Sequence, residues 1–443
     1  MRRRFPVKIR QEQIPILKTN ILIQKGGRNS MRHDFSSSCG MPEDIQTQCC
    51  IAGGGPAGIM LGYLLARAGV DVVVLEKHAD FFRDFRGDTI HPSTMEVLYE
   101  LGILDAFLRV PHQALYELYV RLNGEHVKVV DFSHLPVHCQ YIALMPQWDF
   151  LSFLAEAGQK FPSFHLYKNA EVTGLIHEGA QVRGVRARTP GGEQAIYTPL
   201  TVGADGRDSV VRLLAGLEVI ESGVPIDVLW LRIPKGKEIK EQTLGYFKEG
   251  KTMVLIDRDE YYQCGYIIAK GAYEEIRARG LESFRADVLS LAPFLRGYVD
   301  AINSWDDIKL LTVQINHLSR WYTDGLLCIG DAAHAMSPAG GVGINLAIQD
   351  AVAAANILSG ALKKGNVTTV LLKKVQQRRE MPARVIQRIQ EFIHDKFINA
   401  QYEPGPGGNK LTSAFVWVLR HIPILQRIPA RVVGMGLRPE HVR

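Results

Sequence analysis

The stretch from residue 49 to residue 76 constrains the fold more than any other part of the sequence. It reads as a short apolar strand, a glycine turn, an amphipathic helix and a second strand over residues 70–75. Gly53, Gly55 and Gly58 have the spacing GxGxxG. The first permits a tight turn, the second lets the backbone approach a pyrophosphate, and the third lets helix and strand pack closely. The pattern predicts the opening βαβ unit of an α/β fold.

An acidic residue completes this pattern. Glu76 ends the second strand 18 residues after Gly58, where its carboxylate can accept hydrogen bonds from the hydroxyls of an adenosine ribose. The helix that begins near Pro56 directs its free N–H groups and the positive end of its dipole at the phosphates. Because all these parts occur in order, the segment predicts a site for an ADP-containing dinucleotide, either FAD or NAD.

Length and charge exclude several classes of protein. A chain of 443 residues has room for two or three domains. Its net charge is +6, but residues 1–40 carry nine Lys or Arg against two acidic residues, so the remaining 403 residues sum to −1. Residues 41–443 therefore lack the excess of basic residues that is typical of nucleic-acid-binding proteins. No uncharged apolar run approaches the ~18–20 residues that span a bilayer, so no transmembrane segment is expected.

Residues 1–46 are predicted to be a disordered extension, because the folded pattern begins only at about Thr47. A targeting segment is the second interpretation. The six cysteines form no CxxC pair, and four of them fall in apparent strands, where cysteine behaves as a small hydrophobe. This usage predicts a reducing, cytoplasmic location, with no disulfide framework and no metal site.

Two further glycine motifs follow far along the chain. Residues 203–209 read GADGRDS, after an apolar strand. Residues 330–351 read GDAAHAMSPAGGVGINLAIQDA, after a strand over residues 326–329. Asp331 would leave that strand at the carboxyl end of the sheet, where a carboxylate can hold ribityl hydroxyls. The helix that begins near Asn345 can stabilise negative charge on a reduced isoalloxazine. Three such loops in this order favour FAD.

With these motifs the chain resembles the aromatic-hydroxylase family of single-component flavoprotein monooxygenases, the group typified by para-hydroxybenzoate hydroxylase. The resemblance covers residues 47–400. It rests on the GxGxxG at 53–58 with Glu76, the Asp-Gly pair at 205–206, and the Gly-Asp pair at 330–331 with Pro338. The family uses NAD(P)H to reduce FAD, and O2 then adds at flavin C4a to form a hydroperoxide. The resemblance therefore implies hydroxylation of an aromatic, polycyclic or unsaturated small molecule.

The resemblance also implies which residues hold FAD. They are Gly53, Gly55, Ala57, Gly58, Glu76, Lys77, Arg86, Gln147, Val172, Asp205, Asp331, Gly343, Ile344 and Asn345. Among them, Val172 would contact the adenine end through its backbone, and Arg86 and Gln147 would contact the ribityl–pyrophosphate region. Asp205 resembles the position linked both to FAD and to the transient NAD(P)H. No separate nicotinamide domain is expected.

The fold that the resemblance implies is α/β, with a Rossmann-like FAD-binding domain interleaved with a mostly antiparallel substrate sheet, and with C-terminal helices. The FAD domain would comprise residues 47–117, 144–215 and 313–400, the substrate domain 118–143 and 216–312, and a C-terminal helical tail 401–443. The tail is too short for the thioredoxin-like domain of longer relatives. Its apolar, arginine-bearing part, residues 411–433, fits a packed helix, a dimer contact or a membrane-surface contact, and packing is the simplest of these.

No side-chain base is required, because the flavin carries the oxygen chemistry. Pro338, Arg232 and Tyr266 are the candidates for a catalytic role, and Tyr262 could also assist deprotonation of a phenol. The histidines His91 and His334 are expected to be structural. Ser93 or Thr94 is expected to cap the helix that contains Leu98.

Three alternatives remain open from the sequence alone. Residues 230–234, WLRIP, resemble the WxWxIP motif of flavin-dependent halogenases, but Arg232 replaces its second Trp. Reduction of an isoprenoid alkene is a second alternative, which oxygen consumption would separate from hydroxylation. The third is a non-enzymatic flavin-binding protein that signals its redox state to a partner.

Overall fold

The computed structural model describes residues 44–82, 89–236, 238, 243–258, 260–394 and 423–443. The chain divides into two compact units, Met1–Gly40 and Met41–Arg443, and every described residue belongs to the second. The expected N-terminal extension up to residue 43 and the candidate Arg86 lie outside the described residues. The fold begins earlier than the expected Thr47, because strand β1 (Asp44–Gln46) already pairs with another strand and buries Ile45.

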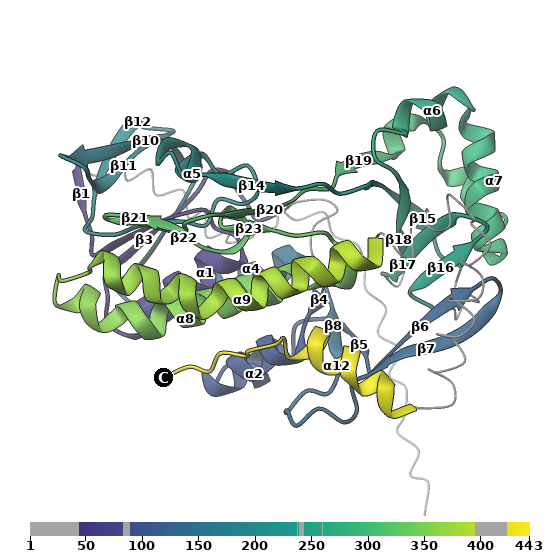
Figure 1. Ribbon diagram of the computed structural model, residues 1–443, viewed down its shortest axis with the longest axis horizontal. Helices are drawn as coiled ribbons and strands as arrows, with labels where there is room; N and C mark the ends of the chain where they lie inside the picture. The colour runs from purple at the N-terminus through teal and green to yellow at the C-terminus, as the bar shows by residue number, and fades with distance from the viewer. Residues whose placement is uncertain (1–43, 83–88, 237, 239–242, 259, 395–422) are drawn as a thin grey trace, which may run out of the picture. The chain divides into compact units, whose positions relative to one another are not determined.

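A six-stranded sheet forms the centre of the FAD-binding part (Figure 1). Its order is β21 (Tyr322–Thr323), β22 (Leu326–Cys328), β13 (Thr201–Gly203), β2 (Cys49–Ala52), β3 (Val72–Glu76) and β9 (Phe164–Lys168). All neighbours are parallel except β21 and β22. The residues of β2 and β3 are buried throughout, as is typical of parallel strands covered on both faces. The predicted βαβ unit is therefore confirmed.

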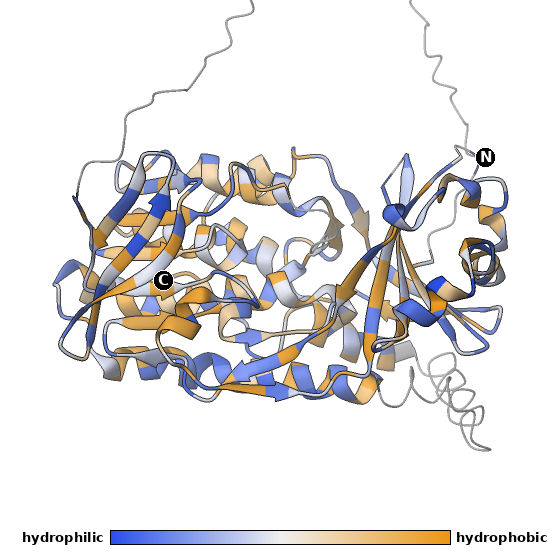
Figure 2. Ribbon diagram, turned by 90° about the horizontal axis from the view of Figure 1, so that it is seen from above, coloured by the Kyte–Doolittle hydropathy of each residue, from blue (hydrophilic) through white to orange (hydrophobic). Residues whose placement is uncertain are grey.

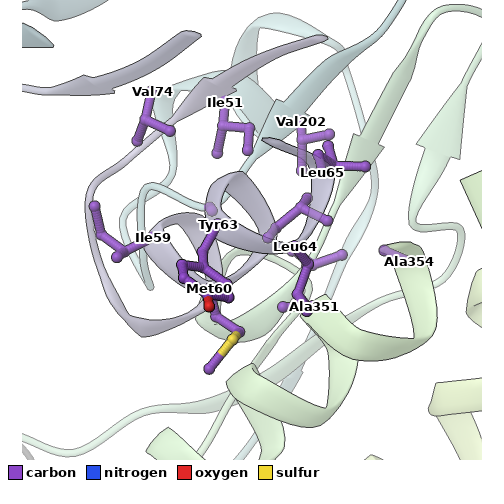
Figure 3. Close-up of a cluster of buried hydrophobic side chains, with 14 of the residues drawn as sticks. Ile51, Ile59, Met60, Tyr63, Leu64, Leu65, Val74, Val202, Ala351 and Ala354 are labelled. Atoms are coloured by element: carbon purple, nitrogen blue, oxygen red, sulfur yellow. The ribbon is translucent and has the colours of Figure 1, made fainter. Parts of the chain in front are cut away.

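Three helices pack around this sheet. They are α1 (Pro56–Arg67), α4 (Gln147–Gly158) and α8 (Gly343–Lys363), and α9 (Thr369–Ile393) packs on α8. Figure 3 shows Ile51 and Val74 of the sheet gathered with Leu64 of α1 and Ala351 of α8 in one apolar cluster. Among the described helices, only Ala339–Lys363 is long and apolar enough to cross a membrane, and 78% of its apolar window is buried inside the fold. That burial is typical of a core helix.

Three smaller sheets complete this part of the molecule. One has the order β1, β12 (Gly192–Tyr197), β11 (Gln181–Thr189) and β10 (Glu171–Glu178). The second has the order β14 (Val219–Ser222), β20 (Ile315–Leu318) and β23 (His334–Ala335). The third has the order β4 (Thr89–Ile90), β8 (Ile142–Leu144) and β5 (Gln113–Leu115). Two short helices, α3 (Leu104–Phe107) and α5 (Val210–Leu214), lie in the connections.

A seven-stranded sheet joins the two segments predicted to form the substrate domain. Its order is β19 (Lys309–Thr312), β15 (Ile226–Pro234), β18 (Tyr261–Ala269), β17 (Lys251–Asp257), β16 (Gly245–Lys248), β6 (Glu117–Leu122) and β7 (Glu125–Asp131). All pairs are antiparallel except β16 with β6. Helices α6 (Tyr273–Ala278) and α7 (Leu281–Leu291) pack beside it, and in Figure 2 hydrophobic and hydrophilic residues alternate along many strands. The predicted architecture is confirmed, while the domain boundaries stay a prediction.

Two local expectations need correction or completion. Helix α2 (Pro92–Glu100) has His91 as its N-cap, and neither Ser93 nor Thr94 caps it. The reason is Pro92, whose fixed φ and missing N–H suit the first helical position. In the C-terminal tail, α12 (Arg427–Gly434) packs against β7 and buries Ala430, as plain packing requires. The rest of the tail up to residue 422 lies outside the described residues.

Candidate functional site

The three glycine motifs lie at one edge of the central sheet. Gly53 follows β2, Ala204 follows β13 and Gly330 follows β22, while Glu76 is the last residue of β3. These four strands are neighbours and parallel, so their carboxyl ends meet at the same edge. This edge is where open α/β sheets bind their ligands. Motifs up to about 280 residues apart in sequence thus form one site.

Gly53 is fixed by packing of the first motif on the second. Its φ is +107°, and a Cβ there would lie 2.3 Å from the carbonyl oxygen of Ala204. A Cβ on Gly58 would lie 1.9 Å from the carbonyl oxygen of Gly53. Neither separation is possible for real atoms, so both positions require glycine to fold.

Gly55 and Gly343 differ from these packing glycines. A Cβ on Gly55 would meet nothing closer than 4.0 Å, and a Cβ on Gly343 would meet nothing within 4 Å. Both stand at the N-termini of helices, α1 and α8, and neither helix has a side-chain cap. The orphan N–H groups of these helices therefore remain available for a ligand with negative charge. An elongated dinucleotide such as FAD fits this pair of open, uncapped termini.

Glu76 is held beside the glycine turn. Its Oε2 accepts a hydrogen bond of 3.0 Å from the N–H of Gly54, its Oε1 accepts one of 3.0 Å from His78, and the residue is 8% exposed. The backbone of Ala170 donates to the Glu76 carbonyl at 2.9 Å, which brings the segment before Val172 to the end of β3. Lys77 follows Glu76 directly and is exposed. Three residues expected to hold FAD, Glu76, Lys77 and Val172, thus lie in one region.

Gln147 is the first residue of α4, and its neighbour Trp148 reaches the segment that follows Glu76. The rings of Trp148 and Phe82 are 4.8 Å apart. Helix α4 therefore begins beside Phe82, and a ligand shared by Gln147 and Arg86 stays a prediction.

Asp205 has local partners. Its carboxylate accepts a hydrogen bond of 2.5 Å from the Ser209 hydroxyl and one of 3.1 Å from the N–H of Val211. Ser209 itself caps α5. Asp205 thus holds the start of α5 through these hydrogen bonds. Its expected role toward FAD and NAD(P)H stays a prediction.

Asp331 has a different environment from Asp205. Its side chain is 33% exposed and lies 3.6 Å from the guanidinium Nη2 of Arg207. The Nε and Nη1 atoms of Arg207 are buried and have no hydrogen-bond partner among the described residues. Such orphaned donors need an acceptor, which a polar ligand at this edge can supply. Arg207 was not among the predicted residues, although the charged position inside GADGRDS was a usable signal.

The loop of the third motif ends on α8, where Ile344 and Asn345 are buried. The Asn345 amide oxygen accepts hydrogen bonds from Ser93 at 2.6 Å and from Thr94 at 3.1 Å. Ser93 and Thr94 therefore tie α2 to the start of α8. Gly330 closes the other end of this loop with a φ of +61°, and a Cβ there would lie 3.1 Å from that of Ala57 in α1.

A buried ion cluster supports the same loop. Asp350 accepts hydrogen bonds from the N–H of Gly330 at 3.0 Å, from Arg379 at 3.0 Å, and from His334 at 2.6 Å. Burial alone would raise the pKa of the Asp350 carboxyl, but His334 and Arg379 outweigh that effect and lower it. The expected structural role of His334 agrees with this geometry. Asp350 was not predicted, although it is the one acidic residue in an otherwise uncharged apolar helix segment, residues 343–362.

The candidate catalytic residues do not converge. Tyr266 lies in the core between β18 and α7, with its ring 5.2 Å from that of Phe284. Arg232 is exposed on β15, with its guanidinium 5.3 Å from the ring of Tyr261. Pro338 alone lies in the loop of the third motif. A catalytic role for Tyr266 or Arg232 has no support in this arrangement.

Two cavities differ in what they can hold. One of about 320 Å³ is lined, among the described residues, by Ser222, Gly223, Pro225 and Glu391. The other, of about 10 Å³, lies between the β5–β8 pair and the seven-stranded sheet and includes Tyr262 in its wall. Only the first approaches the ~300–1,000 Å³ of small-molecule sites, because about 10 Å³ has room for roughly one water.

These features fit a protein that binds FAD at the carboxyl end of its central sheet. Residues 46–389 match the FAD binding domain family, so the chain belongs to that family. The resemblance inferred from the motifs is confirmed.

Particular relatives agree with this assignment. The chain is 32% identical over 356 residues to 6-methylpretetramide 4-monooxygenase of Streptomyces rimosus, covering 79% of this chain and 84% of that protein. It is 28% identical to an uncharacterised aromatic compound monooxygenase, YhjG, of Bacillus subtilis, covering 76% and 66%. The solved structure of p-nitrophenol 4-monooxygenase PnpA of Pseudomonas putida has a TM-score of 0.75 at 20% identity, covering 90% and 100%. The last similarity shows the fold.

Proposed function

We propose that the protein is an NAD(P)H-dependent FAD monooxygenase that uses O2 to hydroxylate an aromatic or related unsaturated small molecule. The observation that carries the proposal is the meeting of three glycine motifs, two uncapped helix termini and Glu76 at one sheet edge. The names of the relatives support an oxidoreductase that acts on aromatic compounds. FAD, when bound, supplies the oxygen-activating chemistry.

The residues of this chain bind and orient the cofactor. The N–H groups at the start of α1 stabilise the pyrophosphate, and Glu76 accepts hydrogen bonds from the adenosine ribose. Asp331 holds the ribityl chain while Arg207 offers its unpartnered donors beside it. The start of α8 would lie toward the pyrimidine end of FAD, where its dipole would stabilise negative charge.

The substrate binds in the cavity lined by Ser222 and Glu391. Glu391 adjoins Gln390, whose side-chain amide donates to the carbonyls of Ser337 at 3.0 Å and Ala339 at 2.8 Å. These two residues flank Pro338, so Gln390 ties the part of α9 that bears Glu391 to the loop of the third motif. Its volume of about 320 Å³ suits a substrate of one or two rings. The Glu391 carboxylate can accept a hydrogen bond from a ring hydroxyl.

The test is a screen of the purified protein for NAD(P)H oxidation stimulated by phenols, quinone precursors and polyketides. Oxygen uptake and the mass of the product are recorded together. The proposal predicts stimulation by a small aromatic compound and a product heavier by one oxygen atom. NAD(P)H oxidation without oxygen uptake would instead identify a reductase, and a chlorinated or brominated product a halogenase.

A flavin-binding protein without turnover is the non-enzymatic alternative, and stimulated NAD(P)H oxidation excludes it. The same assay with each nucleotide separates NADH from NADPH. The cytoplasmic location and a homodimer stay predictions, which fractionation and light scattering address.

A further inference from the structure

We propose that the C-terminal segment, residues 423–443, positions the flavin loop. It does so through hydrogen bonds of two groups, the Glu440 side chain and the backbone carbonyl of Val433. The flavin loop is defined here as residues 330–342, between β22 and α8. Two chains of hydrogen bonds lead from the segment to the two ends of this loop. The inference rests on the proposed function only in that the loop must face bound FAD.

The first chain of hydrogen bonds reaches the start of the flavin loop. The N–H of Gly330 donates to Asp350, and Arg379 donates to the other carboxylate oxygen of Asp350, both at 3.0 Å. A second nitrogen of Arg379 donates to Glu440 at 3.4 Å and to the carbonyl of Arg438 at 3.0 Å. Two buried side chains, Asp350 and Arg379, thus connect the tail to the first residue of the loop.

The second chain reaches the end of the loop. The two ring nitrogens of His91 lie 2.7 Å from the carbonyl oxygen of Val433 and 3.0 Å from that of Gly341. Thr89 also donates to the Gly341 carbonyl at 2.8 Å. His91 is fully buried, and burial lowers the pKa of its imidazole, so the neutral ring has one N–H and donates to only one of these two carbonyls at a time. The tail therefore reaches the start of the loop through Arg379 and Asp350, and the end of the loop through His91.

The buried charges give the first chain its rigidity. Asp350, Arg379 and Glu440 are 0%, 1% and 6% exposed. Glu440 also accepts a hydrogen bond of 2.6 Å from Arg378, and its N–H donates to the Gln349 side chain. Without Glu440, Arg379 keeps Asp350 as its one carboxylate and can shift, and the Asp350 carboxylate that holds Gly330 can shift with it.

The contacts of His441 and Val442 with Glu100 provide a control for the Glu440 contacts. Glu100 in α2 accepts hydrogen bonds from the His441 ring and from the N–H of Val442 at 2.7 Å. These contacts anchor the tail in a partly exposed place, and none of them continues to the flavin loop. A change at Glu100 should weaken the tail's attachment without an effect on the loop itself.

The experiment compares Glu440→Ala, Glu440→Gln and Glu100→Gln in the full chain. Each apoprotein is titrated with FAD, and the thermal midpoint and the visible spectrum of the bound flavin are recorded. Glu440→Ala should raise the dissociation constant for FAD about tenfold and shift the flavin spectrum. Glu440→Gln should do the same to a smaller extent. Glu100→Gln should lower the thermal midpoint but keep FAD affinity within about twofold.

Two results would overturn the inference. One is unchanged FAD affinity and spectrum in Glu440→Ala; the other is an equal loss in Glu440→Ala and Glu100→Gln, which marks the tail as a general stabiliser. If Glu440→Ala does not fold, the same two criteria apply to Glu440→Gln. A wild-type apoprotein that fails to bind FAD contradicts the proposed function instead, so the two failures are distinguishable.

Discussion

The Glu76 carboxylate accepts a 3.0 Å hydrogen bond from the backbone N–H of Gly54, which ties the end of β3 to the first glycine motif. The same carboxylate accepts a second hydrogen bond from His78, so both of its oxygens face backbone donors. Its position is therefore fixed before any ligand binds. A fixed acceptor at the edge of the sheet is what recognition of a ribose diol requires.

Glu76→Ala should weaken FAD binding. Loss of the acceptor costs ~1–3 kcal/mol, which corresponds to roughly 5- to 150-fold in the dissociation constant. Flavin content after purification and FAD titration measure the effect. Glu178→Gln, at an exposed ion pair with Arg183, is the control and should retain full affinity. Equal affinity in Glu76→Ala and wild type would refute the ribose assignment.

Asp331→Ala and Asp205→Ala should affect different properties, the first FAD binding and coupling and the second thermal stability. Asp331 faces Arg207 and is partly exposed at the sheet edge, so its loss should lower FAD affinity or increase the share of NAD(P)H that yields hydrogen peroxide. Asp205 bonds to Ser209 and Val211, so its loss should lower the thermal midpoint first. Measuring dissociation constant, peroxide yield and thermal midpoint for both variants separates the roles. If Asp331→Ala changes only the thermal midpoint, its cofactor role is wrong.

Asp350→Asn should destabilise the fold by ~3–5 kcal/mol at neutral pH, because it breaks a buried ion pair with Arg379. The pKa of Asp350 is lowered in the folded state from its ordinary value of 3.8. The stability that this lowered pKa contributes is therefore present above pH 3.8 and is lost as the pH falls through the folded-state pKa.

Urea unfolding of both proteins at neutral pH and below pH 3.8 checks this sign. The difference between wild type and Asp350→Asn should shrink in acid. A difference that grows on acidification would contradict the charged, paired state of Asp350.

Deletion of residues 1–40 should leave flavin content unchanged, because every described residue belongs to the compact unit Met41–Arg443, whose first described element is β1, beginning at Asp44. Thermal midpoint and FAD content of the shortened protein measure this. A deletion that reaches past Ile45 should be destabilising, since Ile45 is buried where β1 pairs with β12. Loss of flavin in the shorter deletion would give the N-terminal segment a structural role.

The parts of the fold that were predictable are those whose residues are close in sequence. The GxGxxG spacing and the acid at Glu76 each follow from a single βαβ unit, and hairpins such as the one at Asn123 follow from their turns. The order of strands in the two main sheets was not predicted, because pairing between distant strands leaves no local signal. The cap of α2 was wrong because a proline one residue before Ser93 set the start of the helix.

The parts of the site that were missed depend on tertiary contacts. The sequence marks Arg207 and Asp350 as charged residues in unusual places, but only the folded chain brings one to Asp331 and the other to Arg379. The tail contacts through Glu440 could not be inferred either, since Glu440 lies 61 residues from Arg379. Tyr266 was a catalytic candidate only because a tyrosine hydroxyl can transfer a proton. In the structure its side chain is buried in a hydrophobic core.

The most direct measurement of the central claim is an FAD titration of wild type, Gly55→Ala and Gly53→Ala with thermal midpoints on the same samples. A Cβ on Gly55 enters open space where the pyrophosphate would lie, whereas a Cβ on Gly53 strikes Ala204. The account predicts that Gly55→Ala keeps its thermal midpoint as an apoprotein and loses FAD affinity by tenfold or more, while Gly53→Ala loses stability itself. Wild-type FAD affinity in Gly55→Ala would contradict an FAD site at this edge of the sheet.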